Sequence, residues 1–485
     1  MDILLIDPPY ASLKGMSVER CYNIGLTSLA AYLRHQGMET AVLMGDMLTD
    51  LRRSLSQRLL PGISFNPKEY AAGQHKYETI VSDRSHPIWK SLAQIVRQTS
   101  PLAVGIPYLT PTKYAVERVA SLIKEVDREI KVIVGSFHPT FCPEEVMQNP
   151  DIDFVVRGEG EVPLLSLVKE LKKDSPEWAK VPGIHYRDGK GRVRSNAAAS
   201  LIENLDALPY PARNLVLNSD YDFYRLHCVS TTRGCPYTCS FCADRRLWGG
   251  KIRRRSVESV IKELSFLKDT YKITFVDIVD GTFTFDRKYV QAFCRALIDR
   301  NLNIKWRCTA RYDNLNEDLL QLMKQANCSG LYLGLESGSD RILKAIDKKM
   351  NVEMVVSGSK MVRDSGIQTA TSILLGLPNE GKKDIEDTLQ LMKRLETDIL
   401  DVNSYIPLAG TPLYDAINEE DRRNIDWRKV GMKSFDNYFL KDISHEDFKK
   451  YLFEAYGIAN SVRRKTLLRI GARRFFHSIT RMFGK

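Results

Sequence analysis

The chain has 485 residues, 43% of them hydrophobic, which is more than one core usually holds, so we expect two or three domains. Nine scattered cysteines are too few for a disulfide framework, and no apolar run is long enough for a membrane span or a leader segment, which together indicate a reduced, cytoplasmic protein. The formal net charge of +11 does not by itself indicate nucleic-acid binding, because the basic residues are spread along the chain and become dense only near its end.

Residues 1–170 are expected to form an α/β domain in which short apolar strands alternate with amphipathic helices. The helices are predicted at Ile24–Gln36 and Tyr114–Val126, where apolar residues recur at helical spacing. This alternation favours a Rossmann-like, doubly wound parallel sheet, with a ligand crevice at the carboxyl ends of its strands. The stretch from Ser54 to Arg97 fits no element of the pattern. The predicted strands are 3–6, 40–44, 103–106, 132–134 and 152–156.

A second series of strands and helices begins near Cys228. Six βα units favour a partial (β/α)6 barrel over residues 216–425, with its active site at the carboxyl ends of the strands. Residues 171–215 are expected to hold a hairpin, with Asp188-Gly189 at its turn, and a linker, "LPYPAR". Residues 426–485 are expected to form a helical, basic C-terminal region. The predicted barrel strands are 228–231, 273–279, 304–309, 330–335, 369–375 and 399–405.

The loop after the first barrel strand reads "TTRGCPYTCSFCADRR" and carries Cys235, Cys239 and Cys242. A structural zinc site needs four closed ligands, so zinc would require a fourth ligand from elsewhere in the chain. In a cubane iron-sulfur cluster, by contrast, three thiolates leave one iron without a protein ligand. That open iron can bind a molecule with adjacent amine and carboxylate groups and pass an electron to it.

The segment "RGCPYTCSFC" resembles the signature of the radical S-adenosylmethionine (SAM) enzymes, and the resemblance extends from Cys228 to about Asp415. It implies that the three cysteines are the catalytic ligands of a 4Fe-4S cluster, supplied by an external low-potential electron donor. "IVDGTFTFD", "GLYLGLESGSD" and "ILLGLPNEG" resemble further motifs of these enzymes. The alternative is that their polar residues only shape turns at strand ends. The implied cofactor contacts are Phe241 and Gly376 beside the adenine, Asp280 and Gly281 near the methionine group, and Glu336 and Ser337 at polar groups of the cofactor.

Arg311 lies in "WRCTARYD", where the third barrel strand should end at the mouth of the barrel. It could hold a cofactor carboxylate through two hydrogen bonds, or it could be a salt-bridged residue of the rim. Cys294, Cys308 and Cys328 fall within helix or strand patterns and are expected to be small buried apolar residues.

In the first domain, "GIPYLTPT", "IVGSFHPT" and "IDFVVRGEGE" resemble the cobalamin-binding domain that precedes the barrel in one large group of radical SAM enzymes. The resemblance implies a bound cobalamin and crevice loops near the corrin or its nucleotide tail. Loops after strands also contain glycine, serine and threonine for turn geometry alone, and His138 could equally be a hydrogen-bonded loop residue. The implied contacts are Leu109, Thr110, Gly135, Ser136 and His138.

The sequence departs from the usual cobalamin-binding pattern at three places. No histidine lies between Met1 and Arg34, so a bound cobalt would lack the lower axial histidine of the first loop. Pro107 and Tyr108 stand in place of Ser-x-Leu, and Ser136 replaces the second glycine of a Gly-Gly pair. These departures put retention of cobalamin in question.

The leading functional hypothesis is a cobalamin-dependent radical SAM methyltransferase that acts on an unactivated carbon. The alternative is a non-methylating member of the same group, such as an oxidative cyclase of tetrapyrrole synthesis. Transfer-RNA methylthiolation is disfavoured because that family has three amino-terminal cysteines, whereas only Cys21 and Cys142 precede Cys228 here. A non-enzymatic electron carrier is disfavoured because carriers usually shield all four irons with protein ligands.

The tail from Arg463 to Lys485 contains no acidic residue, and its basic residues alternate with leucine, isoleucine and phenylalanine. A basic helix with aromatic residues can lie in a membrane interface, which would favour a hydrophobic, lipid-like substrate such as an isoprenoid or a tetrapyrrole. The alternative is an ordinary helix packed on the barrel with a solvated basic face. Nucleic acid is not expected as a partner, because no aromatic stacking module accompanies the charge.

Overall fold

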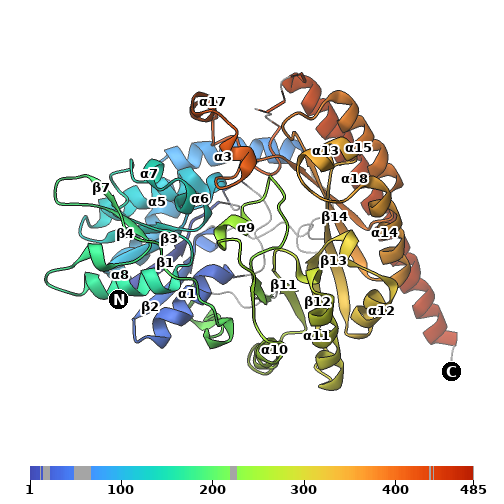
Figure 1. Cartoon of the computed structure of the whole chain (residues 1–485), viewed down its shortest axis with the longest axis horizontal. Helices are drawn as coiled ribbons and strands as arrows, with labels where there is room; N and C mark the ends of the chain where they lie inside the picture. Colours follow the sequence, from blue (N-terminus) through green and yellow to red (C-terminus); the bar gives the residue numbers. More distant parts are fainter. Residues whose placement is uncertain are drawn as a thin grey trace. The chain divides into compact units, whose positions relative to one another are not determined.

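The computed structural model describes residues 1–10, 13–14, 22–48, 67–218, 227–435, 439–440 and 442–483. The chain divides into two compact units, whose course along the sequence can be followed in Figure 1. The first unit contains residues 1–54, 68–281 and 407–430, and the second contains residues 55–67, 282–406 and 431–485. The loop with the three motif cysteines therefore belongs to the same compact unit as the N-terminal sheet.

The main sheet of the first unit has seven strands in the order β2-β1-β3-β4-β5-β6-β7. Strands β1 to β5 are parallel, and β6 and β7 are antiparallel. The order reverses between β1 and β3, which is where a doubly wound sheet opens its ligand crevice. This confirms the predicted Rossmann-like domain. The strands are β1 Ile3–Asp7, β2 Thr40–Met44, β3 Ala103–Pro107, β4 Lys131–Gly135, β5 Phe154–Val156, β6 Ile184–Arg187 and β7 Val193–Ser195.

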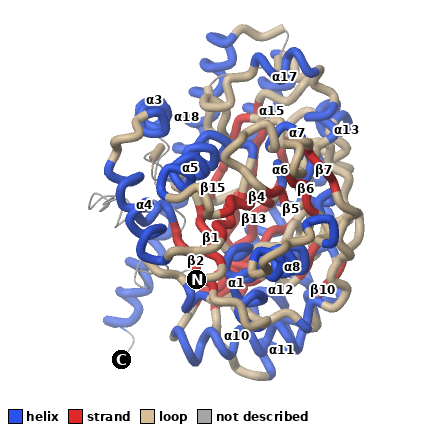
Figure 2. The backbone as a smooth tube through the Cα atoms, turned by 90° about the vertical axis from the view of Figure 1, so that its left-hand side faces the viewer, coloured by secondary structure: helices blue, strands red, loops and turns tan. Residues whose placement is uncertain are grey.

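Helices cover both faces of this sheet (Figure 2). Helices α1 (Ile24–His35) and α8 (Glu161–Leu171) pack on one face, and α4 (Pro87–Thr99) and α5 (Lys113–Val126) pack on the other. Because both faces are buried, β1 to β5 are nearly continuous apolar runs rather than alternating ones.

The stretch 54–97, which the sequence pattern left unassigned, is helical where the structure describes it, apart from a turn at residues 83–86. Residues 54–66 lie outside the described residues, and two helices follow: α3 (Pro67–Ser82) and α4. Helix α4 begins with His86 as its N-cap and Pro87 at its first position, a favourable start for a helix. Its Trp89, Leu92 and Val96 are buried at helical spacing, so the pattern was present in the sequence and was missed.

The predicted hairpin is confirmed, and it extends the first sheet. Strand β6 pairs with β5 and with β7, both in antiparallel orientation. At the turn, Gly191 donates a backbone hydrogen bond to the Asp188 carbonyl, and the Asp188 carboxylate accepts from the backbone of Lys190 and Arg192.

All six predicted barrel strands are present, and they confirm the (β/α)6 series. In the first unit, β8 (His227–Val229) pairs in parallel with β11 (Phe275–Ile278), and α10 (Val257–Tyr271) lies between them in the sequence. In the second unit, β12 to β15 pair consecutively in parallel. These strands are β12 Lys305–Ala310, β13 Cys328–Glu336, β14 Gln368–Leu375 and β15 Ile399–Ser404. The helices of this series in the second unit are α11 Arg287–Asp299, α12 Glu317–Gln325, α13 Asp340–Ala345, α14 Val352–Ser365 and α15 Lys382–Arg394.

Two short helices, α16 (Pro412–Asp415) and α17 (Glu419–Asn424), return the chain to the first unit. The predicted C-terminal helix is α18 (His445–Phe483), which packs against α15 and β15 in the second unit. Among the described residues, no helix is long and apolar enough to cross a membrane.

Candidate active site

The motif cysteines lie on a loop that begins at Gly234, and the backbone conformation there requires glycine. The loop follows β9 (Thr232–Arg233), which pairs with β10 (Arg253–Arg254). Gly234 has φ +104°, and a Cβ at this position would lie 2.1 Å from the Lys251 carbonyl oxygen. A side chain directly before Cys235 would therefore collide with the opposite backbone.

Gly281 brings the loop after β11 against the cysteine loop. A Cβ on Gly281 would lie 3.4 Å from Cys235 Cβ and 2.5 Å from Asp244 Oδ2, at the start of the short helix α9 (Asp244–Leu247). Gly281 thus lies against the cysteine loop within the first unit, whereas its predicted contact with the methionine group stays a prediction.

Asp280, the neighbour of Gly281, is only 3% exposed and holds the strand end that leads into the cysteine loop. Its carboxylate accepts hydrogen bonds from Thr231 N at 2.7 Å, Thr232 N at 3.1 Å and Ser230 Oγ at 3.3 Å, and also from the Thr231 hydroxyl. Burial raises the pKa of Asp280, and these bonds oppose that effect. The bonds give Asp280 a positioning role, whereas its predicted contact with the methionine group stays a prediction.

The three motif thiols are close together, and as thiolates they suit the positively charged core of an iron-sulfur cluster. Cys235 and Cys239 are half-buried and Cys242 is exposed, and Cys242 N donates to the Cys239 carbonyl at 3.1 Å. Although Cys242 as a residue is exposed, desolvation of its thiol, together with Asp244 and the other two cysteines, raises its pKa to about 12. Three adjacent thiolates therefore need a cationic partner, which an iron-sulfur core supplies. Phe241, beside Cys242, is partly exposed.

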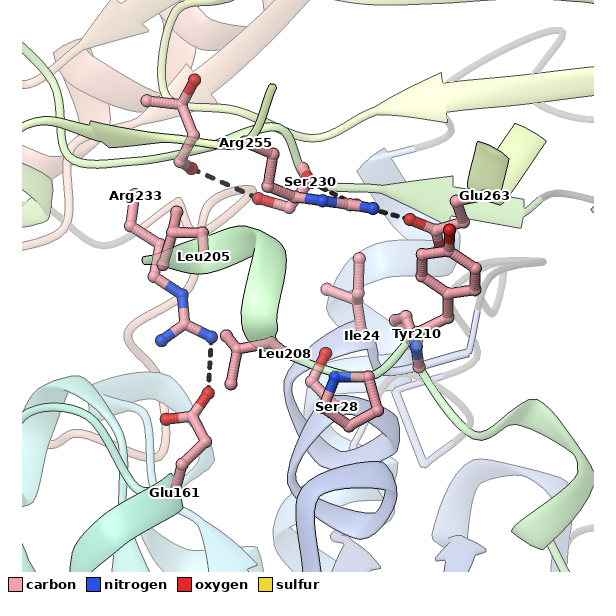
Figure 3. A pocket seen from close by; sticks show the side chains of 13 residues that line it. Ile24, Ser28, Glu161, Leu205, Leu208, Tyr210, Ser230, Arg233, Arg255 and Glu263 are labelled. Atoms are coloured by element: carbon pink, nitrogen blue, oxygen red, sulfur yellow. Dashed lines mark hydrogen bonds and ion pairs between the residues drawn. The ribbon is translucent and has the colours of Figure 1, made fainter. Parts of the chain in front are cut away.

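Arg233, at the end of β9, ties the cysteine loop to the N-terminal sheet. Its Nη1 lies 2.6 Å from Glu159 Oε1, and its Nη2 lies 2.5 Å from Glu161 Oε1 at the first residue of α8; Figure 3 shows the latter pair. Arg253 Nη1 lies 2.8 Å from Glu159 Oε2. Sequence reasoning missed these pairs, although Arg233 stands in the cysteine motif and both glutamates stand in "RGEGE".

A pocket beside Arg233 is a different feature (Figure 3). It encloses about 520 Å³ of space, part of it open to solvent, between α1, residues 205–211 and the end of β8. Its two arginines are already paired, Arg233 with Glu161 and Arg255 with Glu263 at 2.5 Å. None of the three motif cysteines lines it, so it is not the candidate site.

In the second unit, Glu336 ends β13 with φ +77° and is only 7% exposed. Lys348 Nζ lies 2.7 Å from Glu336 Oε1, and Ser372 Oγ donates to its Oε2 at 3.4 Å. A left-handed backbone at a non-glycine residue is strained, and such strain often marks functional sites. The lysine also supplies the partner that a buried carboxylate requires.

The other predicted residues of the second unit make internal contacts. Arg311 holds a carboxylate bidentately, as one interpretation expected, but it is that of Asp313, at 2.9 and 3.0 Å. Ser337 is fully buried and accepts from Ser339 N at 3.2 Å. Gly376 has φ +88°, and its N–H donates at 2.7 Å to Glu380, whose pKa burial raises to about 8. The prediction of small buried cysteines is confirmed for Cys294, Cys308 and Cys328.

In the crevice of the first sheet, Leu109 is 40% exposed and Gly135 ends β4. Ser136 has φ +86° and ψ −159°, a conformation suited to the glycine that it replaces. Thr110 and His138 point inward instead: both are buried, and Thr110 Oγ1 lies 3.1 Å from His138 Nδ1. His138 lies in α6 and is hydrogen-bonded as the alternative interpretation expected, whereas its predicted contact with cobalamin stays a prediction. Contacts of Leu109, Thr110, Gly135 and Ser136 with a corrin stay a prediction.

The comparisons with known proteins agree with this geometry. The model of the radical SAM superfamily matches residues 229–392, and that of the B12-binding domain matches residues 69–168. An uncharacterized methyltransferase of Pyrococcus horikoshii is 33% identical over 386 residues, which cover 79% of this chain and 83% of that protein. The chain belongs to the radical SAM enzymes with a B12-binding domain. Its cofactors are a 4Fe-4S cluster, SAM and cobalamin.

Other similar proteins differ in their reactions. The anaerobic magnesium-protoporphyrin IX monomethyl ester cyclase of Rubrivivax gelatinosus is 29% identical, over 66% of this chain and 59% of that protein. The hopanoid C-2 methylase of Rhodopseudomonas palustris is 26% identical, over 61% of this chain and 54% of that protein. The solved structure of OxsB, a cobalamin-dependent SAM radical enzyme, has a TM-score of 0.66 at 18% identity and covers 93% of this chain and 65% of that one. This likeness confirms the fold.

Proposed function

We propose that this radical SAM enzyme transfers a methyl group to an unactivated carbon of a small molecule. The observation that carries the proposal is the ion pair between Arg233 and Glu159, which joins the cysteine loop to the loop after β5 of the B12-binding domain. Such a link holds the two cofactor regions in one compact unit, as transfer between them requires. The cyclase relative supports a second candidate, oxidative ring formation on the same scaffold.

When bound, the cluster supplies the electron that cleaves SAM, and cobalamin carries the methyl group. The chain's own residues provide placement. Cys235, Cys239 and Cys242 would hold the cluster, while Gly234 and Gly281 allow the backbones around it to approach closely. Asp280 fixes the strand end before them. An external low-potential protein or reductant would deliver the electron.

For SAM, we keep Phe241, Gly281, Glu336 and Gly376 as candidate contacts. Glu336 has the strongest support, because its left-handed backbone is strained, and such strain often marks functional sites. Ser337 and Arg311 have weaker support, since their polar atoms are engaged by Ser339 and by Asp313.

For cobalamin, we propose binding without an axial histidine. The first loop offers no histidine, and His138 is buried with its Nδ1 held 3.1 Å from Thr110 Oγ1. The paramagnetic spectrum of bound cobalt should then show no superhyperfine coupling to a histidine nitrogen. Strong coupling of that kind would contradict the proposal.

The finer proposal for the substrate is a hydrophobic ring system, either tetrapyrrole or isoprenoid, met at a membrane surface. Two relatives act on such molecules by name. In the described part of the tail, Leu468 is 76% exposed and Leu467 is 37% exposed, beside Arg464 and Lys465. Arg469, however, is held by Asp398, as an ordinary packed helix would require. Vesicles with anionic lipid should bind the full chain and not a chain that lacks residues 462–485; equal binding would reject the membrane contact.

The reaction is tested with SAM that carries a deuterated methyl group. The anaerobically reconstituted enzyme, with cobalamin and a low-potential reductant, is offered a tetrapyrrole and an isoprenoid. A product that carries the trideuterated methyl group supports methyl transfer. A product that has lost hydrogen and carries no label supports ring formation and rejects the proposal.

A further inference from the structure

A second group of metal-binding side chains lies apart from the motif cysteines. His138, Cys142 and Glu145 are spaced by four and three residues, across the short helices α6 (Phe137–Phe141) and α7 (Pro143–Val146). Cys142, with φ −129° and ψ 50°, forms the non-helical junction between the two helices. One ligand atom from each lies within 4.8 Å of the others.

The histidine of this group is held as a metal ligand usually is. His138 is 1% exposed, its ring stacks on Tyr108 with centroids 5.0 Å apart and planes 7° apart, and its Nδ1 lies 3.1 Å from Thr110 Oγ1. Its Nε2 is buried and has no hydrogen-bond partner among the described residues. A buried polar atom of this kind is costly unless something binds it. A partner on one ring nitrogen leaves the other free for a metal ion.

Two carboxylates and one lysine lie in and around the group, so its charge balance allows one more cation. Glu145 Oε1 lies 2.6 Å from Lys113 Nζ, which balances one carboxylate. Glu117 lies close by, where it accepts from Tyr108 OH at 3.3 Å. Cys142 Sγ lies 3.7 Å from Tyr414 OH, and desolvation raises the pKa of the Cys142 thiol. A metal ion would stabilise the thiolate and supply the partner that His138 Nε2 lacks.

We propose that His138 Nε2, Cys142 Sγ and the Glu145 carboxylate bind one zinc-type divalent ion. The mixed nitrogen, sulfur and oxygen set suits Zn²⁺, and water or Tyr414 would complete four-coordination. The ion would join the loops after β3 and β4 to α16, all in the first unit. This site is separate from the cluster and does not depend on the reaction that the enzyme catalyses.

The site is tested in the full chain with Cys235, Cys239 and Cys242 replaced by alanine, so that the cluster cannot form. When zinc is the only metal added and the excess is removed by dialysis, one zinc ion should remain bound per chain. Cobalt alone should give a thiolate-to-cobalt charge-transfer band. X-ray absorption of the zinc form should show one sulfur among nitrogen and oxygen neighbours. No retained zinc, or a zinc shell without sulfur, would overturn the proposal.

Single variants then identify the ligands. H138N, C142S and E145Q should each lose stoichiometric zinc, and C142S should also lose the cobalt band. T110V should weaken binding about 10–100-fold, because it removes the partner that holds the imidazole. K113M should tighten binding by about tenfold or more, because Lys113 repels the ion. E144Q, at an exposed neighbouring carboxylate, is the matched control and should change nothing. Zinc affinity that is unchanged in C142S or in folded H138N, or that is weaker in K113M, would overturn the proposal. His138, Glu145 and Lys113 would then form an ion-pair network that binds no zinc.

Discussion

Arg233, two residues before the first cluster cysteine, lies 2.6 Å from Glu159 in the loop that follows β5. Glu159 also binds Arg253, which is only 5% exposed. A single buried carboxylate therefore compensates two cations, and its loss would leave Arg253 buried without a counter-charge.

The first prediction is that E159Q lowers the free energy of unfolding by about 3–5 kcal/mol, the cost of breaking a buried ion pair. The measurement is chemical denaturation followed by circular dichroism. The control is E203Q, because Glu203 pairs with Lys251 at 3.0 Å and both side chains are at least 60% exposed. E203Q should cost less than about 1 kcal/mol. An equal loss of unfolding free energy in the two variants would mean that the buried ion pair stabilises the protein no more than the exposed one.

The second prediction concerns Asp280. In D280N, the amide would turn a donor toward Thr231 N–H or the Thr231 hydroxyl, so the strand end before the cysteines should loosen. We expect a loss of about 1–3 kcal/mol in stability and a lower iron content after reconstitution. T231V should act in the same direction, whereas T231S keeps the hydroxyl and should resemble the wild type. Full iron occupancy in D280N would contradict the positioning role.

The third prediction is that S136G stabilises the protein. Ser136 holds a backbone conformation that costs a non-glycine residue about 1–3 kcal/mol, and glycine gives back about 0.5–1 kcal/mol through the unfolded state. A net gain of about 1 kcal/mol should raise the midpoint of thermal denaturation. S136A keeps the Cβ and should bring no gain. A lower midpoint for S136G would show that the serine hydroxyl has a role that the structure does not explain.

The fourth prediction is a loss of stability in mild acid that depends on His227. Desolvation, with a contribution from Arg213, lowers the pKa of His227 to about 4, whereas the unfolded chain has a value near 6.5. Between these values the unfolded state binds the proton and the folded state does not, so stability falls as pH falls. From pH 8 to pH 5 the loss should be about 2 kcal/mol. H227F keeps the ring contact with Tyr271 and should remove this part of the pH dependence. If the stability of H227F depended on pH as that of the wild type does, His227 would not cause the loss in mild acid.

The strands and the cysteine loop could be predicted because their signals are local. Apolar runs bounded by turn residues marked β1 to β5, and the spacing of Cys235, Cys239 and Cys242 indicated the cluster. The ties of Glu159 to Arg233 and Arg253 could not be predicted, because they join residues 74 and 94 positions apart, and charged residues in a sequence are usually solvated. The inward turn of His138 depends on a stacking partner and on Thr110, which only the fold brings together.

We infer that the three cysteines support SAM cleavage for methyl transfer through cobalamin. The most direct measurement is mass spectrometry of the anaerobically reconstituted enzyme, given cobalamin, a low-potential reductant and SAM with a deuterated methyl group. We expect 5′-deoxyadenosine and trideuterated methylcobalamin from the wild type, and no 5′-deoxyadenosine when all three cysteines are replaced by alanine. Retained 5′-deoxyadenosine in that variant, or a wild type that takes up zinc and no iron, would contradict it.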